Sequence, residues 1–386
     1  MELRFSTQRV LKIFYGICGE GLGHSGRSIA LVERLTALGH HVTIFTFADA
    51  LAALAKAGYL PHRIAGLQFG VTASGGVSTV GTVGNFCRYL HTRRESLDMI
   101  RQLALAEQPD LCITDFEPLV ALAAESLGVP CVSVDNQHRF CEPLGRGFSL
   151  RLQVYSRLAG QFVRRWIKRP RQSIVAVFHQ CPPSPHYQRV EALVRDRIAR
   201  LEPTGGDHLL LYAKGPLGRR MLEVASTVRA RFIAYGANGA GAPNIAFKPT
   251  DYDHTVVRGS PDPAPNVARS GDRPQLRAAN IAFKPTDYDQ FAADLASCRG
   301  VLCSAGQQLI SEAHYFGKPL LVVPMPGQHE QEINARFARQ EAIGDWSSIT
   351  ELSRERIEKC FDRHFTAERP ANGVDQVLDL LGIGHG

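Results

Sequence analysis

Residues 11–47 read LKIFYGICGEGLGHSGRSIALVERLTALGHHVTIFTF. A short apolar run at 11–15 leads into a segment, Gly16 to Gly26, that holds five glycines. Residues 28–38 space their apolar side chains three and four apart, as a helix with one buried face does, and Gly39 is suited to end that helix. Residues 41–47 are apolar again. The stretch predicts a strand, a glycine-rich turn, a helix and a second strand.

The same alternation recurs along both halves of the chain. Further strands are predicted at 110–115, 129–134, 209–212, 231–235, 300–303 and 320–324, with helices at 118–127, 291–296 and 308–316. Alternating β and α elements predict parallel, doubly wound sheets with helices on both faces. Because 386 residues exceed the usual size of one core, we expect two Rossmann-like domains, at 1–200 and 201–386.

Composition is that of a folded globular protein, with 44% hydrophobic and 21% charged residues. The net charge of +7 suits phosphorylated ligands or an anionic membrane surface and does not choose between them. The nine cysteines show no paired or metal-binding spacing, so we expect reduced thiols and no bound metal. No apolar stretch reaches the ~20 residues of a membrane span, and the start lacks a signal peptide's pattern. These features predict a cytoplasmic protein.

Residues 139–171 form a basic segment, with nine Arg or Lys and one acid, Glu142. The segment either holds the protein on the inner face of an anionic membrane or is a solvated helical surface. Nucleic-acid binding is not expected, because the segment carries no recognised module or stacking aromatics.

One decapeptide, NIAFKPTDYD, occurs at 244–253 and again at 280–289. Two copies are too few for a solenoid, and residues 254–279 between them show no hydrophobic periodicity. We therefore expect an internal duplication in which 244–279 is an exposed loop. The second copy leads directly into a predicted helix and should pack natively.

The glycine-rich segment is the first candidate site. Gly21, Gly23 and Gly26 match the spacing of a dinucleotide-binding loop, although the acidic residue expected ~20 positions later is not clearly present. Glycines let the backbone approach a ligand, and the following helix start offers free N–H groups. His24, at that helix start, should stay neutral near pH 7 because the dipole disfavours the imidazolium. His24 is thus a candidate general base, with a backbone-bonding role as its alternative.

Two other strand ends carry polar residues toward the same edge of the sheet. Asp115 ends the strand at 110–115. It either has a functional role, in which it orients His24 or binds the acceptor, or it N-caps the next helix. Asn136 follows the strand at 129–134 and is assigned, with Gly21 and Gly23, to the acceptor side of the site.

The most specific pattern is Ser304-x-Gly306-x4-Ser311-Glu312-Ala313, then Gly317-x-Pro319, then Pro324-Met325-Pro326-Gly327-Gln328-His329-Glu330-Gln331 with Asn334-Ala335. This pattern resembles the donor site of GT-B glycosyltransferases, especially the lipid-linked peptidoglycan N-acetylglucosaminyltransferase and the UDP-glycosyltransferases. The chain looks closest to a prokaryotic branch of that superfamily.

The resemblance implies a GT-B fold whose C-terminal domain binds a nucleotide-sugar donor, most simply a UDP-sugar, without a cofactor or metal. Backbone N–H groups and a helix start would stabilise the diphosphate. Glu312 would accept the ribose hydroxyls, and Glu330 and Gln331 would contact the sugar. The implied donor residues are Ser304, Ala305, Gly306, Gln307, Gln308, Glu312, Gln328, Glu330 and Gln331.

The expected activity is that of a hexosyltransferase. An acceptor hydroxyl attacks the anomeric carbon with His24 as base and inverts its configuration, and binding to a membrane would give access to a lipid-linked acceptor. A nucleotide-sugar epimerase or hydrolase of the same fold, and a non-catalytic nucleotide-sugar-binding protein, are the alternatives. The first loop of the second domain departs from the family pattern, because residues 212–219 lack the Gly-Ser-x-Gly of many relatives. This difference favours the non-catalytic alternative, unless Lys214 or Arg219 contacts the diphosphate instead.

Overall fold

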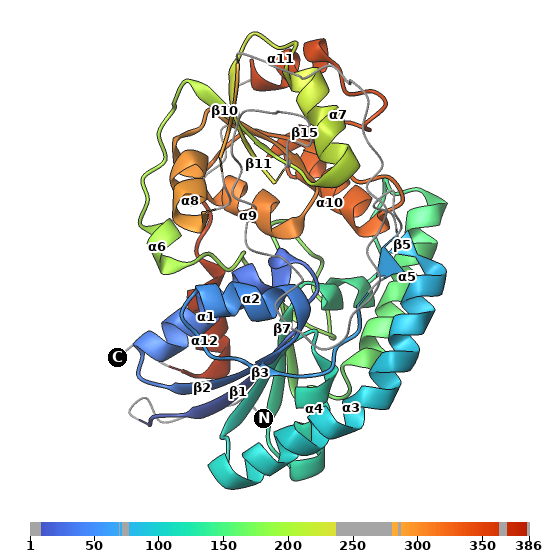
Figure 1. Cartoon of the computed structure of the whole chain (residues 1–386), viewed down its shortest axis with the longest axis vertical. Helices are drawn as coiled ribbons and strands as arrows, with labels where there is room; N and C mark the ends of the chain where they lie inside the picture. The colour runs from blue at the N-terminus through green and yellow to red at the C-terminus, as the bar shows by residue number, and fades with distance from the viewer. Residues whose placement is uncertain are drawn as a thin grey trace, which may run out of the picture.

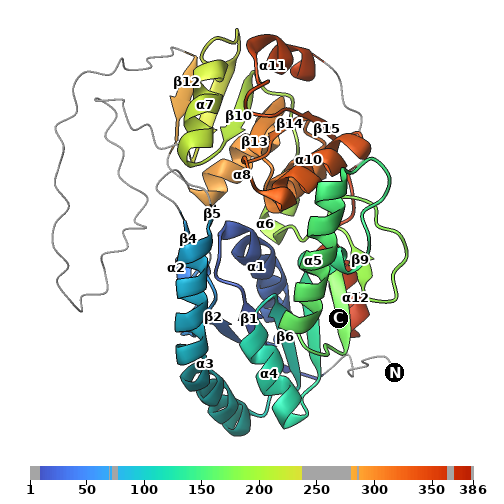
Figure 2. The same cartoon turned by 90° about the vertical axis from the view of Figure 1, so that its right-hand side faces the viewer.

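A computed structural model describes residues 9–68, 70–71, 77–236, 280–284, 287–362 and 369–383. Two parallel β-sheets, each covered by helices on both faces, form two lobes (Figures 1 and 2). The predicted doubly wound α/β architecture is therefore confirmed. The first copy of the duplicated decapeptide and the segment that follows it lie outside the described residues.

The first lobe is built on a parallel sheet whose strand order, among the described residues, is β3-β2-β1-β6-β7-β8-β9. Its strands are β1 (Lys12–Ile17), β2 (His41–Thr46), β3 (His62–Arg63), β6 (Leu111–Asp115), β7 (Cys131–Asp135), β8 (Gln172–Ala176) and β9 (Gln188–Val190). A small antiparallel pair, β4 (Gly70–Val71) and β5 (Val77–Ser78), precedes a long helix. The helices are α1 (Leu22–Ala37), α2 (Ala48–Lys56), α3 (Thr79–Glu107), α4 (Pro118–Leu127), the 3-10 helix η1 (Gln137–Cys141) and α5 (Leu150–Trp166).

The second lobe is built on a parallel sheet with the order β12-β11-β10-β13-β14-β15 among the described residues. Its strands are β10 (His208–Tyr212), β11 (Arg231–Tyr235), β12 (Ile281–Phe283), β13 (Gly300–Ser304), β14 (Leu320–Val323) and β15 (Gly344–Trp346). The helices that follow the first lobe are α6 (Asp196–Ala199), α7 (Gly215–Ala225), α8 (Tyr288–Ser297), α9 (Gln307–Tyr315), α10 (His329–Gln340), α11 (Arg354–Phe361) and α12 (Gly373–Leu381).

Alternating side chains of the buried strands supply the core on each face of both sheets. In the second lobe, Leu210 packs with α8, α9 and α10, whereas Leu209 and Leu211 pack with α7 and α11. In the first lobe, Tyr15 faces α1 and α2, and Phe14 faces α3 and α4. Strands buried on both faces are nearly continuous apolar runs, which is why the sequence pattern located them.

Helix α1 begins earlier than the hydrophobic spacing indicated. The prediction began this helix at residue 28, but the structure begins it at Leu22, so the second half of the glycine-rich segment is helical. Gly21 precedes the helix with a φ of 74°, a value that favours glycine. His24 consequently lies in the first turn of a helix and not in a loop.

The second copy of the duplicated decapeptide packs as expected. The side chain of Asn280 donates to the carbonyls of Ala225, Val228 and Ala230 at 3.0–3.1 Å. Residues 281–283 pair with β11, and Asp287 caps α8 by accepting from the N–H of Gln290 at 2.9 Å.

The last helix, α12, returns to the first lobe. Val374, Val377, Leu378 and Leu381 are fully buried against the face of the first sheet that α1 and α2 also cover. Figure 1 shows α12 beside α1, away from the other helices of the second half. The predicted division at residue 200 placed α12 in the second domain, but this helix packs on the sheet of the first lobe. The hydrophobic pattern of a single amphipathic helix does not indicate which sheet the helix covers.

We expect Leu378→Ala to lower the free energy of unfolding of the first lobe by about 2–5 kcal/mol, because it leaves a cavity in a closely packed core. Leu60→Ala is the matched control, since Leu60 is 95% exposed and its truncation should change stability by less than about 0.5 kcal/mol. Urea denaturation followed by circular dichroism measures both. Equal effects of the two variants would show that α12 does not belong to this core.

Candidate active site

Each sheet reverses its strand order at one point, and the predicted site residues gather there. In the first sheet the reversal lies between β1 and β6, where Ile17 pairs with Asp115. In the second sheet it lies between β10 and β13, where Tyr212 pairs with Cys303. Ligands of open α/β sheets bind outside the carboxyl ends of the strands at such a reversal. The loops after these four strands are therefore the binding loops of the two lobes.

The two reversals face one another. Helix α1 follows β1, helix α9 follows β13, and the two helices are in contact between the lobes. A Cβ added at Gly26 would lie 3.3 Å from Cγ of Gln308. Figure 1 shows α9 of one lobe next to the helices of the other. The starts of α1 and α9 thus share one site.

His24 and Asp115 form a hydrogen-bonded pair within this site. Nδ1 of His24 lies 2.8 Å from Oδ1 of Asp115, which is fully buried at the end of β6. Arg27 binds the same carboxylate through two nitrogen atoms at 2.6 and 2.8 Å, and Ser28 donates to it at 2.9 Å. A carboxylate on Nδ1 fixes the orientation of the ring and leaves Nε2 to exchange a proton.

The alternative role of Asp115, as the N-cap of α4, is filled by Glu117. The carboxylate of Glu117 accepts hydrogen bonds from the N–H groups of Leu119 and Val120, both at 2.8 Å. Burial raises the pKa of Glu117 to about 7, although these two bonds oppose the rise. Of the roles considered for Asp115, the structure therefore places it on His24.

The charge state of His24 differs from what the helix dipole alone predicted. Burial lowers the pKa of His24, but charge interactions with Cys18 and with the carboxylate of Asp115 together raise it above the ordinary value of 6.5. The expectation of a neutral ring near pH 7 is therefore wrong, because a full charge at hydrogen-bond distance outweighs the partial charge of a helix start. Despite its burial, Asp115 has a lowered pKa because Arg27 and His24 stabilise its charge.

The sequence placed Gln137, the first residue of η1, in the segment after β7 that faces the site, but it assigned no role to this side chain. Its Nε2 lies 3.4 Å from Nε2 of His24, and its Oε1 lies 3.4 Å from Arg27. Asn136, the residue assigned to the acceptor side, is buried, and its Oδ1 has no hydrogen-bond partner among the described residues. The two amides are adjacent in sequence, and only the backbone turn after β7 decides which one reaches His24.

The glycines of the first loop serve two purposes. A Cβ at Gly16 would lie 2.6 Å from the Glu117 carboxylate, and one at Gly19 would lie 2.0 Å from the carbonyl of Phe47, so these two are required by packing. Gly21 and Gly23 have no atom within 4 Å of such a Cβ among the described residues. The close approach of a ligand is therefore an explanation for Gly21 and Gly23 only.

The predicted donor loop lies between β13 and α9. Ser304 ends β13, and Gly306 is the N-cap of α9, where no side chain of the described residues caps the first N–H groups. The carbonyl of Ala305 accepts from Asn334 at 3.0 Å, and Gln307 donates to Ser311 at 3.3 Å. These contacts fix a helix start whose N–H groups are suited to an anion.

Glu312 lies in the second turn of α9 and is almost completely buried. Its Oε1 accepts from the hydroxyl of Tyr288 and from Nε2 of Gln308, both at 2.9 Å. Burial raises the pKa of Glu312 against these two bonds. Gln308 also donates to the carbonyl of Leu193 at 3.3 Å, so the donor side of the site contacts the connection between the lobes.

The residues at the start of α10 have separate surroundings. Gln328 is the N-cap of α10. The side chain of Gln331 donates to the side chain of Gln328 at 3.1 Å and accepts from the N–H of Met325 at 2.9 Å. Gln331 thus supports the turn before α10, while Glu330 is partly exposed. Lys214 and Arg219, at the start of α7, are exposed.

Arg139 joins the two lobes, a role that the sequence did not indicate. It lies in η1 and donates to Gln307 at 3.2 Å and to Asn334 at 2.7 Å. Its guanidinium is also 3.5 Å from the Glu330 carboxylate. Because Arg139 is buried by these partners, it does not belong to the exposed basic surface in which the sequence placed it.

The described part of the chain contains no group of three or more His, Cys, Asp or Glu side chains that could hold a metal ion. None of the described helices is both long and apolar enough to cross a membrane.

Two Rossmann-like lobes with facing binding loops define a GT-B glycosyltransferase, and the predicted fold class is confirmed. The chain belongs to glycosyl transferase family 1, whose sequence profile matches residues 11–256 and 268–364. It is therefore an enzyme of glycosyl transfer.

Two relatives from archaea support this assignment. An uncharacterized glycosyltransferase of Methanosarcina mazei is 25% identical over 348 residues, which cover 86% of this chain and 85% of the relative. An uncharacterized glycosyltransferase of Methanosarcina acetivorans is 24% identical over 388 residues, which cover 96% of this chain and 94% of the relative.

Solved structures share the fold at low sequence identity. The glycosyltransferase SnogD of Streptomyces nogalater superposes with a TM-score of 0.54 at 18% identity, covering 97% of this chain and 94% of that one. MurG of Acinetobacter baumannii gives a TM-score of 0.56 at 14% identity, with 96% and 99% covered. The glycosyltransferase VinC, solved in complex with dTDP, gives 0.54 at 15% identity, with 96% and 95% covered.

Asp115→Asn is expected to lower the pKa of His24 by about 1 or more, because it removes the carboxylate charge that favours the imidazolium. Asp135→Asn is the control, since Asp135 is bonded to His138 and not to His24. Titration of the histidine ring signals by NMR, with His24 assigned through a His24→Gln variant, measures the change. An unchanged pKa in Asp115→Asn would contradict the charge pairing.

Proposed function

We propose that this enzyme transfers a hexosyl group from a nucleoside diphosphate sugar to an acceptor hydroxyl, with His24 as the general base. The observation that carries the proposal is the position of the His24–Asp115 pair opposite the uncapped start of α9. A base on one lobe and an anion-binding helix start on the other are the two groups that glycosyl transfer needs on either side of the anomeric carbon.

The donor is proposed to bind on the second lobe. Its diphosphate lies at the N–H groups of residues 306–308, and its ribose hydroxyls replace Tyr288 and Gln308 as partners of Glu312. The helix start then stabilises the leaving diphosphate without a metal ion. Two contacts between the lobes lie at this position, one between Gly26 and Gln308 and one between Arg139 and Gln307. The donor can enter when these contacts are broken, which requires the two lobes to move apart.

The base of the nucleotide is proposed to be uracil or thymine. VinC and SsfS6 were each solved with thymidine diphosphate, and the donor motif resembles that of UDP-glycosyltransferases. Uracil and thymine present the same hydrogen-bonding edge and differ by one methyl group, so one pocket can accept either.

In the proposed reaction the acceptor oxygen attacks the anomeric carbon as the bond to the donor phosphate breaks. The acceptor proton moves to Nε2 of His24, and Asp115 stabilises the resulting imidazolium. Direct displacement inverts the anomeric configuration. Because only the unprotonated ring acts as base and the pKa of His24 is raised, the rate falls as the pH drops through a midpoint above 6.5.

His24→Ala should reduce kcat about 10²- to 10⁴-fold and leave donor affinity unchanged, as loss of a general base does. Glu312→Ala should instead weaken donor binding about tenfold or more, because it removes hydrogen bonds to the ribose. Calorimetry with UDP-, TDP- and GDP-sugars and NMR analysis of products measure the two effects.

Product analysis also separates the alternatives. Sugar release or epimerisation without an acceptor would identify a hydrolase or an epimerase. Donor binding without turnover under any acceptor would identify a non-catalytic protein. Donor affinity that is unaffected by Glu312→Ala would remove the proposed donor site.

We further propose that the acceptor is lipid-linked and that the first lobe docks peripherally on the cytoplasmic face of an anionic membrane. Helix α5 exposes Leu150, Val154, Leu158 and Phe162 at four-residue intervals, and α3 exposes Val83, Phe86 and Leu90. Figure 1 shows α3 and α5 on the right-hand side of the first lobe, and in Figure 2 this side faces the viewer with α3 on the left and α5 on the right. The basic residues of 139–171 other than Arg139 are exposed, and four of them, Arg151, Arg157, Arg164 and Arg165, lie on α5 itself. Exposed apolar side chains next to arginines suit an interface with anionic lipid.

Aromatic rings connect His24 with this surface. The ring of Phe116 lies 6.4 Å from that of His24 and 6.3 Å from that of Phe162, centroid to centroid. An apolar acceptor carrier that lies along α5 would therefore bring its hydroxyl end toward His24.

The double substitution Leu158→Glu and Phe162→Glu should reduce partition onto phosphatidylglycerol vesicles about tenfold or more, because it removes apolar area and adds repulsion. Leu60→Glu, at an exposed position elsewhere, is the control. Co-sedimentation at low salt measures both variants. If the unaltered protein fails to sediment with these vesicles, the membrane proposal is wrong.

A further inference from the structure

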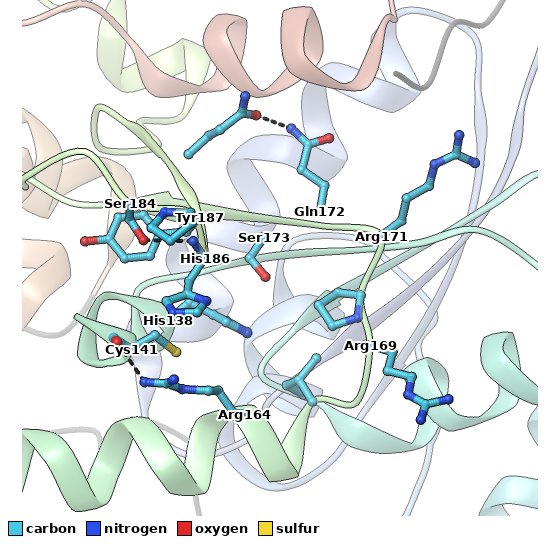
Figure 3. Close-up of a pocket in the computed structure, with 14 residues that line it drawn as sticks. His138, Cys141, Arg164, Arg169, Arg171, Gln172, Ser173, Ser184, His186 and Tyr187 are labelled. Atoms are coloured by element: carbon cyan, nitrogen blue, oxygen red, sulfur yellow. Dashed lines mark hydrogen bonds between the residues drawn. The ribbon is translucent and has the colours of Figure 1, made fainter. Parts of the chain in front are cut away.

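A cavity of about 560 Å³ lies in the first lobe. Turn η1, the end of α5, strand β8 and the loop before β9 surround it (Figure 3). No residue assigned above to the donor or to His24 lines this cavity. Its volume is that of a small-molecule site and exceeds what a bare inorganic ion needs.

The floor of the cavity carries polar side chains. His138 is 4% exposed, and its Nδ1 is fixed at 2.7 Å from the buried carboxylate of Asp135. The hydrogen bonds of His138 to Asp135 use its backbone N–H and its Nδ1, and no hydrogen bond among the described residues uses its Nε2. Ser173, on β8, also lines the cavity. Figure 3 shows the ring of His138 among Arg164, Ser173 and Tyr187. Two buried side chains thus present hydrogen-bonding groups to the cavity.

The wall and rim are cationic. Arg164 is held by a 2.8 Å hydrogen bond to the carbonyl of Cys141 and has no carboxylate partner among the described residues. Arg169, Arg171 and His186 complete the basic lining, and none of the lining residues is Asp or Glu.

Besides Asp135, which is bonded to His138, two acids lie near the cavity. Glu142 accepts from Ser184 at 2.7 Å, and Glu125 lies 3.7 Å from Arg169 in an exposed pair. An exposed ion pair of this kind holds its arginine weakly. Neither of these acids pairs with Arg164, which therefore brings its positive charge to the cavity.

We propose that this cavity binds a ligand that carries a phosphate group. Arg164 supplies the charge, and Oγ of Ser173 donates a hydrogen bond to a phosphate oxygen. Since Nδ1 of His138 faces the Asp135 carboxylate, Nε2 donates to the phosphate when the ring carries both protons and otherwise accepts a hydrogen bond from the ligand. The remaining volume accommodates an organic part of the ligand. The ligand is either a soluble phosphorylated compound or a phospholipid headgroup, which share this chemistry. The inference rests on the cavity alone and not on the proposed function.

The test follows the ring signals of His138 by NMR while pyrophosphate, or monomeric dihexanoyl phosphatidylglycerol, is added. The readout is confined to His138, which lines this cavity and not the proposed donor site, so pyrophosphate bound at the donor site does not produce the signal. We expect a saturable shift that Arg164→Gln weakens about tenfold or more, because one charged hydrogen bond is lost. Ser173→Ala should weaken the binding of the probe less than Arg164→Gln does. Arg157→Gln, on the same helix but outside the cavity, should not change it.

The outcomes are separable from those of the donor site. Glu312→Ala should leave the His138 response unchanged, whereas Arg164→Gln should leave UDP affinity unchanged. A response to pyrophosphate indicates a soluble phosphorylated ligand, and a response to the lipid alone indicates a headgroup. If His138 responds to neither probe, or responds equally in Arg164→Gln, the cavity is not a phosphate site.

Discussion

The fully buried carboxylate of Asp115 is the constraint on which the candidate site depends. A buried charge is costly unless it is paired and hydrogen-bonded, and here Arg27, His24 and Ser28 all bind it from the first turns of α1. These bonds tie the end of β6 to the start of α1 at the point where the first sheet reverses its strand order. They thereby fix where α1 begins, how the His24 ring is oriented and which part of α1 faces the second lobe.

Much of the fold follows from sequence because the strands of a parallel sheet, buried on both faces, are apolar runs. The strand at 231–235 and the helix at 118–127 were predicted with the bounds that the structure has. The pairing of His24 with Asp115 was one of the roles considered, and sequence could not decide because Glu117, two residues later, caps a helix equally well. The donor roles of Glu312, Glu330 and Gln331 stay predictions.

Other features depend on tertiary contacts that a local pattern does not contain. Glycines at 21, 23 and 26 read as a loop, yet the bonds to Asp115 make that segment helical. Arg139 belongs to a basic run but is buried because Gln307 and Asn334, far along the chain, accept its hydrogen bonds. Helix α12 covers the first sheet although it follows the second. In each case the deciding partner lies more than 80 residues away in sequence.

The most direct test of the glycosyl transfer mechanism is a crystal structure of the enzyme with bound UDP or TDP. The account predicts that the diphosphate accepts hydrogen bonds from the N–H groups of residues 306–308. It also predicts that the ribose hydroxyls take the place of Tyr288 and Gln308 on Glu312, with His24 facing the position of the sugar. A nucleotide bound elsewhere, with Glu312 still bonded to Tyr288 and Gln308, would contradict it.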